Sequence, residues 1–181
     1  MIFFRLTFMH KRLFLKLYLL LIFLSGCSSS APLNSERIAQ RYGSYGIEIL
    51  FAGDQQRISN LYSEANGRKT MRTLALVEFT AADAPEIANE HGQVLGGGSI
   101  GAVFKDAGWT IDKGASRYCL SKTDRESLPE LERMGIPHPA ALATRIYVFH
   151  VRKGTVSIDY ATITEIYHPD YVQADANLDD C

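Results

Sequence analysis

The stretch RIYVFHVRKGTVSIDYATITEIY, residues 145–167, decides the fold more than any other part of the chain. It contains two runs rich in Ile, Val, Tyr and Thr, one on either side of Lys153-Gly154. β-Branched and aromatic residues favour extended strands, and a short glycine-containing turn between two such runs is typical of a β-hairpin. We therefore predict a long hairpin formed by Arg145–Arg152 and Thr155–Tyr167.

Upstream of this hairpin the pattern alternates between further strands and short helices. The apolar patterns predict strands at Ile47–Phe51, Arg57–Ser63, Thr70–Thr80, Trp109–Asp112 and Arg117–Ser121, with an Asn66-Gly67 turn after the second. Capping residues and glycines predict helices from Asp83 to Gly92, from Ser99 to Gly108 and from Ser127 to Gly135. This order predicts an α+β fold, with an antiparallel or mixed sheet of about five to seven strands and two or three short helices packed on it.

Residues 1–26 have the layout of a secretory signal peptide. Lys11, Arg12 and Lys16 precede the apolar run Leu17–Leu24. A membrane-spanning helix needs about 20 apolar residues, and upstream extension of this run meets those charges, so a retained membrane anchor is the less favoured alternative. Translation from Met9 would produce a shorter signal peptide of the same layout, so starts at Met1 and at Met9 both stay open.

The segment that follows, Leu24-Ser25-Gly26-Cys27, resembles the lipobox of bacterial lipoproteins. The resemblance implies cleavage before Cys27 and a diacylglycerol on its thiol, usually with a further acyl chain on the new amino terminus. Several acyl chains hold a protein at a membrane to which one chain binds only marginally. Ser28 implies the periplasmic face of the outer membrane, with the inner membrane as the alternative. Residues 27–34 are then a lipid-anchored tether.

The rest of the chain has enough apolar residues for one packed domain, residues 35–172, which precedes an acidic tail, residues 173–181. Assigning Cys27 to lipid leaves Cys119 and Cys181, which an oxidising compartment would join in a disulfide that holds the tail. Alternatively, Cys119 is a buried thiol and Cys181 a free one. No Cys/His cluster has the spacing of zinc ligands, so we predict no metal and no cofactor.

The charge of the chain changes sign at Cys27. Four of the 19 basic residues and none of the 20 acidic residues precede it, so the part from Cys27 onward carries 15 basic and 20 acidic residues. Nucleic acids and anionic lipid headgroups attract clustered Lys and Arg. This acidic balance therefore argues against a nucleic-acid partner.

The glycine-rich stretch GGGSIG, residues 96–101, matches two short motif patterns. As a GxGxxG pattern it lacks the preceding strand that a dinucleotide site requires, because a predicted helix leads into it. As a GxSxG pattern it makes Ser99 a hydrolase nucleophile, but the parallel sheet of that enzyme class does not fit in about 150 residues with hairpin-connected strands. Two other interpretations remain, namely Ser99 as a helix N-cap, and an anion or ligand bound at Gly98 and Ser99.

A hydrolase would also need a histidine and a carboxylate beside its serine. The candidates are His138, His150 and His168, together with Asp112 or Asp159. Their spacing follows no metal-ligand pattern, and hydrogen-bonded structural histidines are the favoured interpretation.

These observations favour a lipid-anchored envelope protein that acts as a non-enzymatic binding or scaffolding module facing the periplasm. Its predicted partners are the membrane, through the lipid on Cys27, and another envelope protein. One alternative is a small periplasmic hydrolase using Ser99 or a histidine. A second alternative is a periplasmic ligand carrier, which requires a deep apolar pocket.

Overall fold

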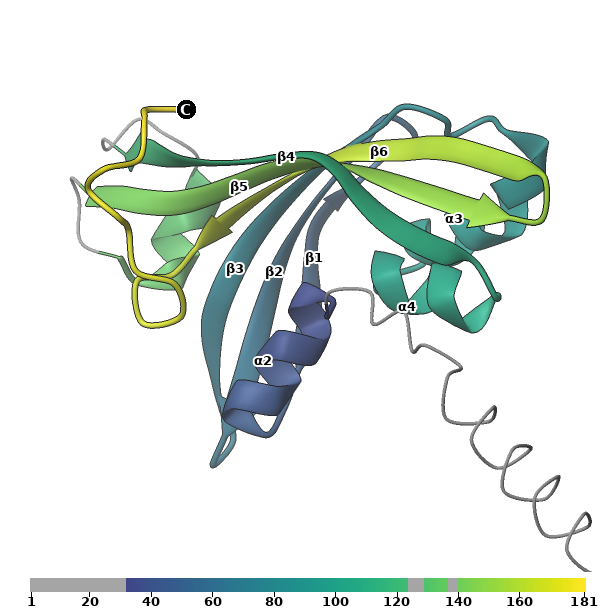
Figure 1. Cartoon of the computed structure of the whole chain (residues 1–181). Helices are drawn as coiled ribbons and strands as arrows, with labels where there is room; N and C mark the ends of the chain where they lie inside the picture. The colour runs from purple at the N-terminus through teal and green to yellow at the C-terminus, as the bar shows by residue number, and fades with distance from the viewer. Residues whose placement is uncertain (1–31, 124–128, 137–139) are drawn as a thin grey trace, which may run out of the picture. The chain divides into compact units, whose positions relative to one another are not determined.

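The computed structural model describes residues 32–123, 129–136 and 140–181. Pro32–Cys181 form one compact unit, built on a six-stranded antiparallel sheet with the order β1-β2-β3-β6-β5-β4 (Figure 1). The strands are β1 (Gly46–Ala52), β2 (Gln56–Ala65), β3 (Arg68–Phe79), β4 (Thr110–Thr123), β5 (Ala140–Lys153) and β6 (Val156–Tyr167). The prediction of an α+β fold is therefore confirmed. The signal peptide, Cys27 and most of the predicted tether lie outside the described residues.

Short helices precede each half of the sheet. The helical segments are α2 (Asn34–Tyr42), the 3-10 turn η1 (Pro85–Ile87), α3 (Ala88–Leu95), α4 (Ile100–Asp106) and the 3-10 turn η2 (Pro129–Met134). No helix in the described ranges is both long enough and apolar enough to cross a membrane. The η2 turn occupies the range of the third predicted helix, whose expected start at Ser127 lies outside the described residues.

The two faces of the sheet pack against different helices. On one face, Ile38 of α2 packs with Ala75 and Tyr167, while Phe104 of α4 packs with Phe149. On the other face, Leu74 packs with residues of the η2 region. Because successive strand side chains point to opposite faces, Leu74 and Ala75 mark these two layers. The face beneath α2 and α4 holds the candidate site.

The two halves of the sheet repeat one arrangement. Each half has three strands that come after a helical segment: α2 precedes β1–β3, and α3 and α4 precede β4–β6. The halves meet where β3 pairs with β6. Thr73–Phe79 pair with Ala161–Tyr167 in continuous antiparallel register. From each edge of the sheet to this central pair, the strands therefore follow one another in chain order. The second half differs in having η2 between β4 and β5, and the amino-acid sequence shows no internal repeat.

The structure corrects three details of the predicted elements. Helix α2 was not predicted, because its N-cap residue is Leu33, which has no polar side chain to mark a helix start. The Glu36 carboxylate instead accepts the Leu33 N–H at 2.9 Å. Gly92 does not end its helix, which continues to Leu95 and buries Val94 completely. The two strand runs around Cys119 form one strand, β4, interrupted by an irregularity between Gly114 and Arg117.

The C-terminal tail is attached to the edge strand β4. Cys119 and Cys181 are joined by a disulfide with a Cα–Cα distance of 5.0 Å. Beside it, the Leu120 N–H donates to the Asp179 carbonyl at 2.8 Å and the Cys181 N–H donates to the Leu120 carbonyl at 2.9 Å. The tail therefore adds backbone pairing to an edge that would otherwise be open at this point.

Replacing Cys181 by serine is expected to lower the free energy of unfolding by about 4 kcal/mol in the loop-entropy model, because the bridge spans 62 residues. Thermal and denaturant unfolding of the oxidised protein and of Cys181→Ser measure the difference. Wild-type protein treated with a reducing agent is the control and should unfold with the variant. Equal stability of the oxidised wild type and the variant would contradict the expectation.

Candidate functional site

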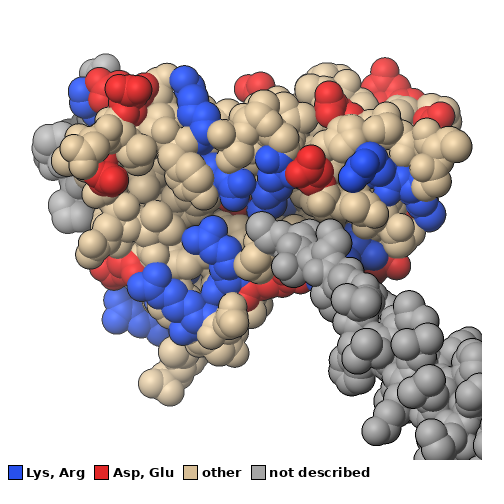
Figure 2. Space-filling view, viewed as in Figure 1, with Lys and Arg blue, Asp and Glu red and all other residues tan. Residues whose placement is uncertain are grey.

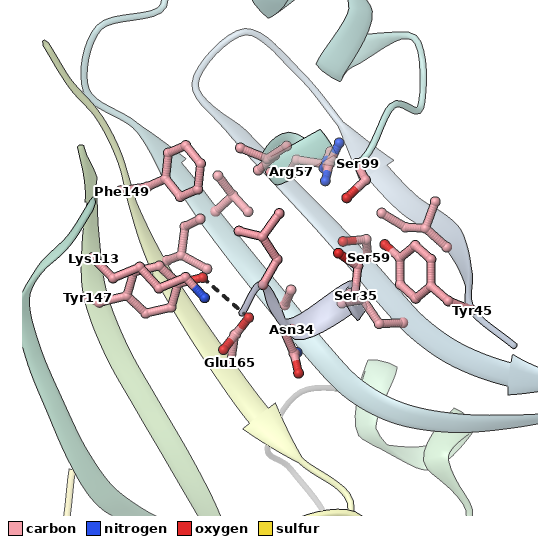
Figure 3. Close-up of a pocket in the computed structure, with 18 residues that line it drawn as sticks. Asn34, Ser35, Tyr45, Arg57, Ser59, Ser99, Lys113, Tyr147, Phe149 and Glu165 are labelled. Atoms are coloured by element: carbon pink, nitrogen blue, oxygen red, sulfur yellow. Dashed lines mark hydrogen bonds between the residues drawn. The ribbon is translucent and has the colours of Figure 1, made fainter. Parts of the chain in front are cut away.

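A small cavity of about 60 Å³ lies between the sheet and the first residues of α2 and α4. Figure 3 shows polar side chains on two sides of it, with Tyr45, Arg57, Ser59 and Ser99 on one side and Lys113, Tyr147 and Glu165 on the other. The walls between them are mostly apolar. Polar groups from both halves of the sheet thus face one space, which is partly open to solvent.

Arg57 of β2 is a buried cation, only 3% exposed. Its Nη1 donates to the carbonyls of Val94 at 2.9 Å and Gly98 at 2.8 Å, which tie β2 to the end of α3 and the following loop. Its Nε is buried and has no hydrogen-bond partner among the described residues. Burial lowers the pKa of the guanidinium, and the neighbours that act against this are the phenols of Tyr160 and Tyr45. The described residues give Arg57 no carboxylate partner.

Ser59 lies two residues further along β2, on the same face of the sheet. It is fully buried, and in the part of the chain that the structure describes its hydroxyl has no hydrogen-bond partner. Nearby, burial raises the pKa of the Tyr45 phenol, and the Ser99 side chain partly offsets that effect. A buried polar group without a partner costs about 1–3 kcal/mol, so Ser59 and Arg57 Nε are the two unsatisfied groups of this wall.

Glu165 of β6 lies on the opposite wall and is 4% exposed. Its carboxylate accepts a hydrogen bond from the Tyr147 hydroxyl at 3.3 Å (Figure 3). It also accepts one from the Tyr167 hydroxyl at 2.6 Å. Burial lowers the pKa of Lys113, and the Glu165 charge partly offsets that effect. Glu165 and Lys113 therefore carry opposite charges across the same end of the cavity.

Ser99 and Gly98, the residues singled out in the sequence, both lie at the cavity. Ser99 occupies the N-cap position of α4, but its side chain makes no capping hydrogen bond. A Cβ on Gly98 would lie 2.7 Å from Val103 Cγ2 and 2.9 Å from the Gln93 carbonyl oxygen, so close packing requires glycine there. Among the described residues that line the cavity there is no histidine to activate Ser99.

His150 forms a hydrogen-bonded chain elsewhere, on the β5–β6 hairpin. Its Nδ1 is hydrogen-bonded to Asp159 Oδ1 at 2.6 Å, and its Nε2 is hydrogen-bonded to the Ser157 hydroxyl at 3.0 Å. The order is that of a serine–histidine–carboxylate triad, but with Ser157 in place of Ser99. An open hollow beside it is lined by His150 and Asp159 without Ser157. Of the other candidates, His168 contacts Asp170, Asp112 lines this hollow, and His138 lies outside the described residues.

A band of basic side chains covers the same face of the sheet as the cavity. We call it the basic–aromatic surface; it comprises Arg37, Arg41, Arg72, Lys113 and Arg145, each over a tyrosine ring. The closest pair places the Arg72 guanidinium 3.8 Å from the centre of the Tyr42 ring. Figure 2 shows Lys and Arg gathered from the centre of this face down over α2. The fold thus makes one face locally basic although the chain from Cys27 onward is acidic overall.

No known protein family matches this chain, and no curated protein matches its sequence. In the parts of the chain that the structure describes, no three His, Cys, Asp or Glu side chains are grouped so as to hold a metal ion. The candidate site is therefore defined by its geometry alone.

Sequence reasoning did not find four of the residues that give this site its charge and polarity: Arg57, Ser59, Lys113 and Glu165. A signal for two of them was present. In β2, Arg57 and Ser59 occupy the same alternate positions as Leu61, which is buried. A polar residue at a core-facing position of a predicted strand is the pattern that would have identified them.

The buried phenols predict loss of stability at alkaline pH. Burial, reinforced by the charge of Glu165, raises the pKa of Tyr147 and Tyr167 well above the ordinary 10.0. Their contribution to stability is therefore full below pH 10 and decreases as pH rises above it, because only the unfolded chain then releases these protons. Tyr147→Phe should weaken this pH dependence, whereas exposed Tyr118→Phe should not.

Phenolate absorbance and near-ultraviolet circular dichroism, followed together during an alkaline titration, measure this effect. In the wild type, ionisation of the buried phenols should coincide with loss of the folded signal. Complete ionisation near pH 10 in a protein that remains folded would show that these tyrosines are not protected.

Proposed function

We propose that this chain is a lipid-anchored protein of the bacterial envelope, a non-enzymatic binding module held by lipid on Cys27 at the periplasmic face of the outer membrane. The cavity beneath α2 is its binding site. The observation that carries this proposal is that Arg57 Nε and Ser59 Oγ, which line the cavity from β2, are buried without hydrogen-bond partners among the described residues. The Asn60 amide of β2 is also unsatisfied, but it does not line the cavity. Buried polar groups are ordinarily hydrogen-bonded, and a bound ligand would supply the missing partner.

The position of the cavity along the chain supports a role close to the membrane. Asn34 lines the cavity and is seven residues after Cys27. Seven extended residues reach at most about 25 Å, so a lipid on Cys27 would keep the site within that distance of the bilayer surface. A partner in the same membrane would meet the cavity and the basic–aromatic surface together, because both lie on one face of the sheet.

The size of the cavity sets the size of the ligand. Sites for drug-sized molecules measure about 300–1,000 Å³, whereas this cavity measures about 60 Å³. It therefore does not favour a carrier of large apolar ligands and suits a small molecule, or a small group of a larger partner.

Both parts of the proposal, the lipid anchor and the binding site, are tested on protein isolated from envelopes in a non-ionic detergent. The wild type is expected in the detergent phase, and native mass spectrometry should show a non-covalent adduct that denaturation releases. Cys27→Ser should move to the aqueous phase and keep the adduct. Ala75→Val, which adds bulk at the cavity wall, should lose the adduct, whereas Ala141→Val on an exposed position should keep it.

The lipid anchor and the binding site can be disproved separately. A Cys27→Ser protein that still partitions with detergent would contradict the lipid anchor. Wild-type protein without any adduct, in a folded state shown by circular dichroism, would contradict the binding site.

The second candidate function is a small hydrolase, and the hydrogen-bonded chain from Ser157 through His150 to Asp159 is the observation that favours it. Such an enzyme also needs donors placed for an oxyanion. A serine-directed fluorophosphonate probe distinguishes the two functions, and under the binding proposal the wild type stays unlabelled. Labelling that disappears in Ser157→Ala but persists in Ser99→Ala would establish the hydrolase instead.

A further inference from the structure

We propose that the cavity binds a small oxyanion, the carboxylate or phosphate group of its ligand, between Arg57 and Ser59. This inference rests on the proposed function, in which the cavity is the binding site, and adds the chemical class of the ligand. It follows from three properties of the cavity: its unbalanced charge, the type of its unsatisfied groups, and its volume.

The charge of the cavity is unbalanced at Arg57. On the opposite wall, the charges of Lys113 and Glu165 compensate each other. Within the described residues, Arg57 donates hydrogen bonds only to backbone carbonyls, and its electrostatic neighbours are the phenols of Tyr160 and Tyr45. Burying a cation without a counter-charge is costly, and an anion beside Arg57 would remove most of that cost.

Both unsatisfied groups can donate a hydrogen bond to an oxyanion. Arg57 Nε–H is a donor only, and the Ser59 hydroxyl can donate. Arg57 and Ser59 are two residues apart on one strand, so their side chains share a face, as Figure 3 shows. Asn34 and Ser35, the first residues of nine-residue α2, also line the cavity. The positive end of that helix dipole favours a negative charge at the same place.

The volume restricts the anion to a few atoms. One water molecule requires about 10–15 Å³, so a cavity of about 60 Å³ has room for roughly four to six atoms of that size. Acetate and inorganic phosphate fall in this range. The apolar walls, which include Leu61, Val77 and Ile163, suit a short alkyl group attached to the anion.

The test uses the protein isolated from envelopes in a non-ionic detergent and follows the Arg57 Nε–H signal by ¹H–¹⁵N nuclear magnetic resonance. Acetate and inorganic phosphate are titrated separately, with chloride at matched ionic strength as the reference. We expect one of the two oxyanions to give a saturable shift of this signal and of residues that line the cavity. Glycerol 3-phosphate is a third probe, since its binding would indicate a lipid headgroup as the source and its exclusion a free anion.

Two serine variants of the same strand separate binding from structure. Ser59→Ala should weaken oxyanion binding by about tenfold, the loss of one charge-assisted hydrogen bond. It should also raise Tm without ligand by about 2–4 °C, because a buried unsatisfied hydroxyl is removed. Ser63→Ala is the matched control. Its hydroxyl already accepts the Arg72 Nε–H at 3.0 Å, so this variant should lower Tm and leave oxyanion binding unchanged.

Three results would overturn the inference: no shift with either oxyanion, an equal shift with chloride, or shifts confined to exposed Lys and Arg. Each of them would leave water as the occupant of the Arg57–Ser59 gap. If native mass spectrometry nevertheless shows a neutral adduct that Ala75→Val loses, the binding module stands without the oxyanion. If the adduct is also absent, both proposals fail.

Discussion

The pairing of β3 with β6 is the contact on which the rest of this structure depends. Thr73–Phe79 and Ala161–Tyr167 join two three-stranded meanders into one continuous sheet. Ser59 and Ala75 then lie on one side of the junction, and Glu165 and Tyr147 on the other, with α2 and α4 above them. The candidate cavity exists only because this junction places polar side chains from both halves on one covered face.

The same junction concentrates polar groups where a sheet of this kind normally buries apolar side chains. Glu165 is stabilised by two tyrosine hydroxyls and by the charge of Lys113. Arg57 is held by the carbonyls at the end of α3, but its Nε and the neighbouring Ser59 hydroxyl are left without partners. One wall of the cavity is therefore internally satisfied and the other is open to a ligand, which is why the proposed oxyanion site lies at Arg57.

The proposed lipid attachment and the disulfide lie near opposite ends of the folded domain. At its start, the segment after the proposed lipid attachment site leads directly into α2, whose first residues line the cavity. At its end, the tail pairs with β4 and is covalently joined to it through Cys119. The disulfide, together with the proposed lipid, would suit the proposed location in an oxidising compartment.

The sequence by itself determined the local features. Apolar alternation and turn residues predicted β1, β2, β3 and β6 to within two residues at each end, because strand formation and the Asn66-Gly67 turn depend on neighbours along the chain. They divided β4 into two runs and started β5 at Arg145, five residues late. The start of α2 was missed, because the residue three positions before Glu36 is a leucine rather than the Ser, Thr, Asp or Asn that marks a helix start in a sequence. Gly92 was misplaced as a helix end, because burial of Val94 outweighs the low helix propensity of glycine. The lipobox resemblance likewise depends only on adjacent residues, and it stays a prediction.

Only the tertiary structure decided which distant side chains meet. Ser157 rather than Ser99 contacts His150, because the hairpin register places them on adjacent strands. Arg57 and Glu165 face one cavity because β3 and β6 pair, although more than a hundred residues separate them. Contacts of that kind depend on strand order and register across the whole sheet, which the pattern of any single strand does not specify.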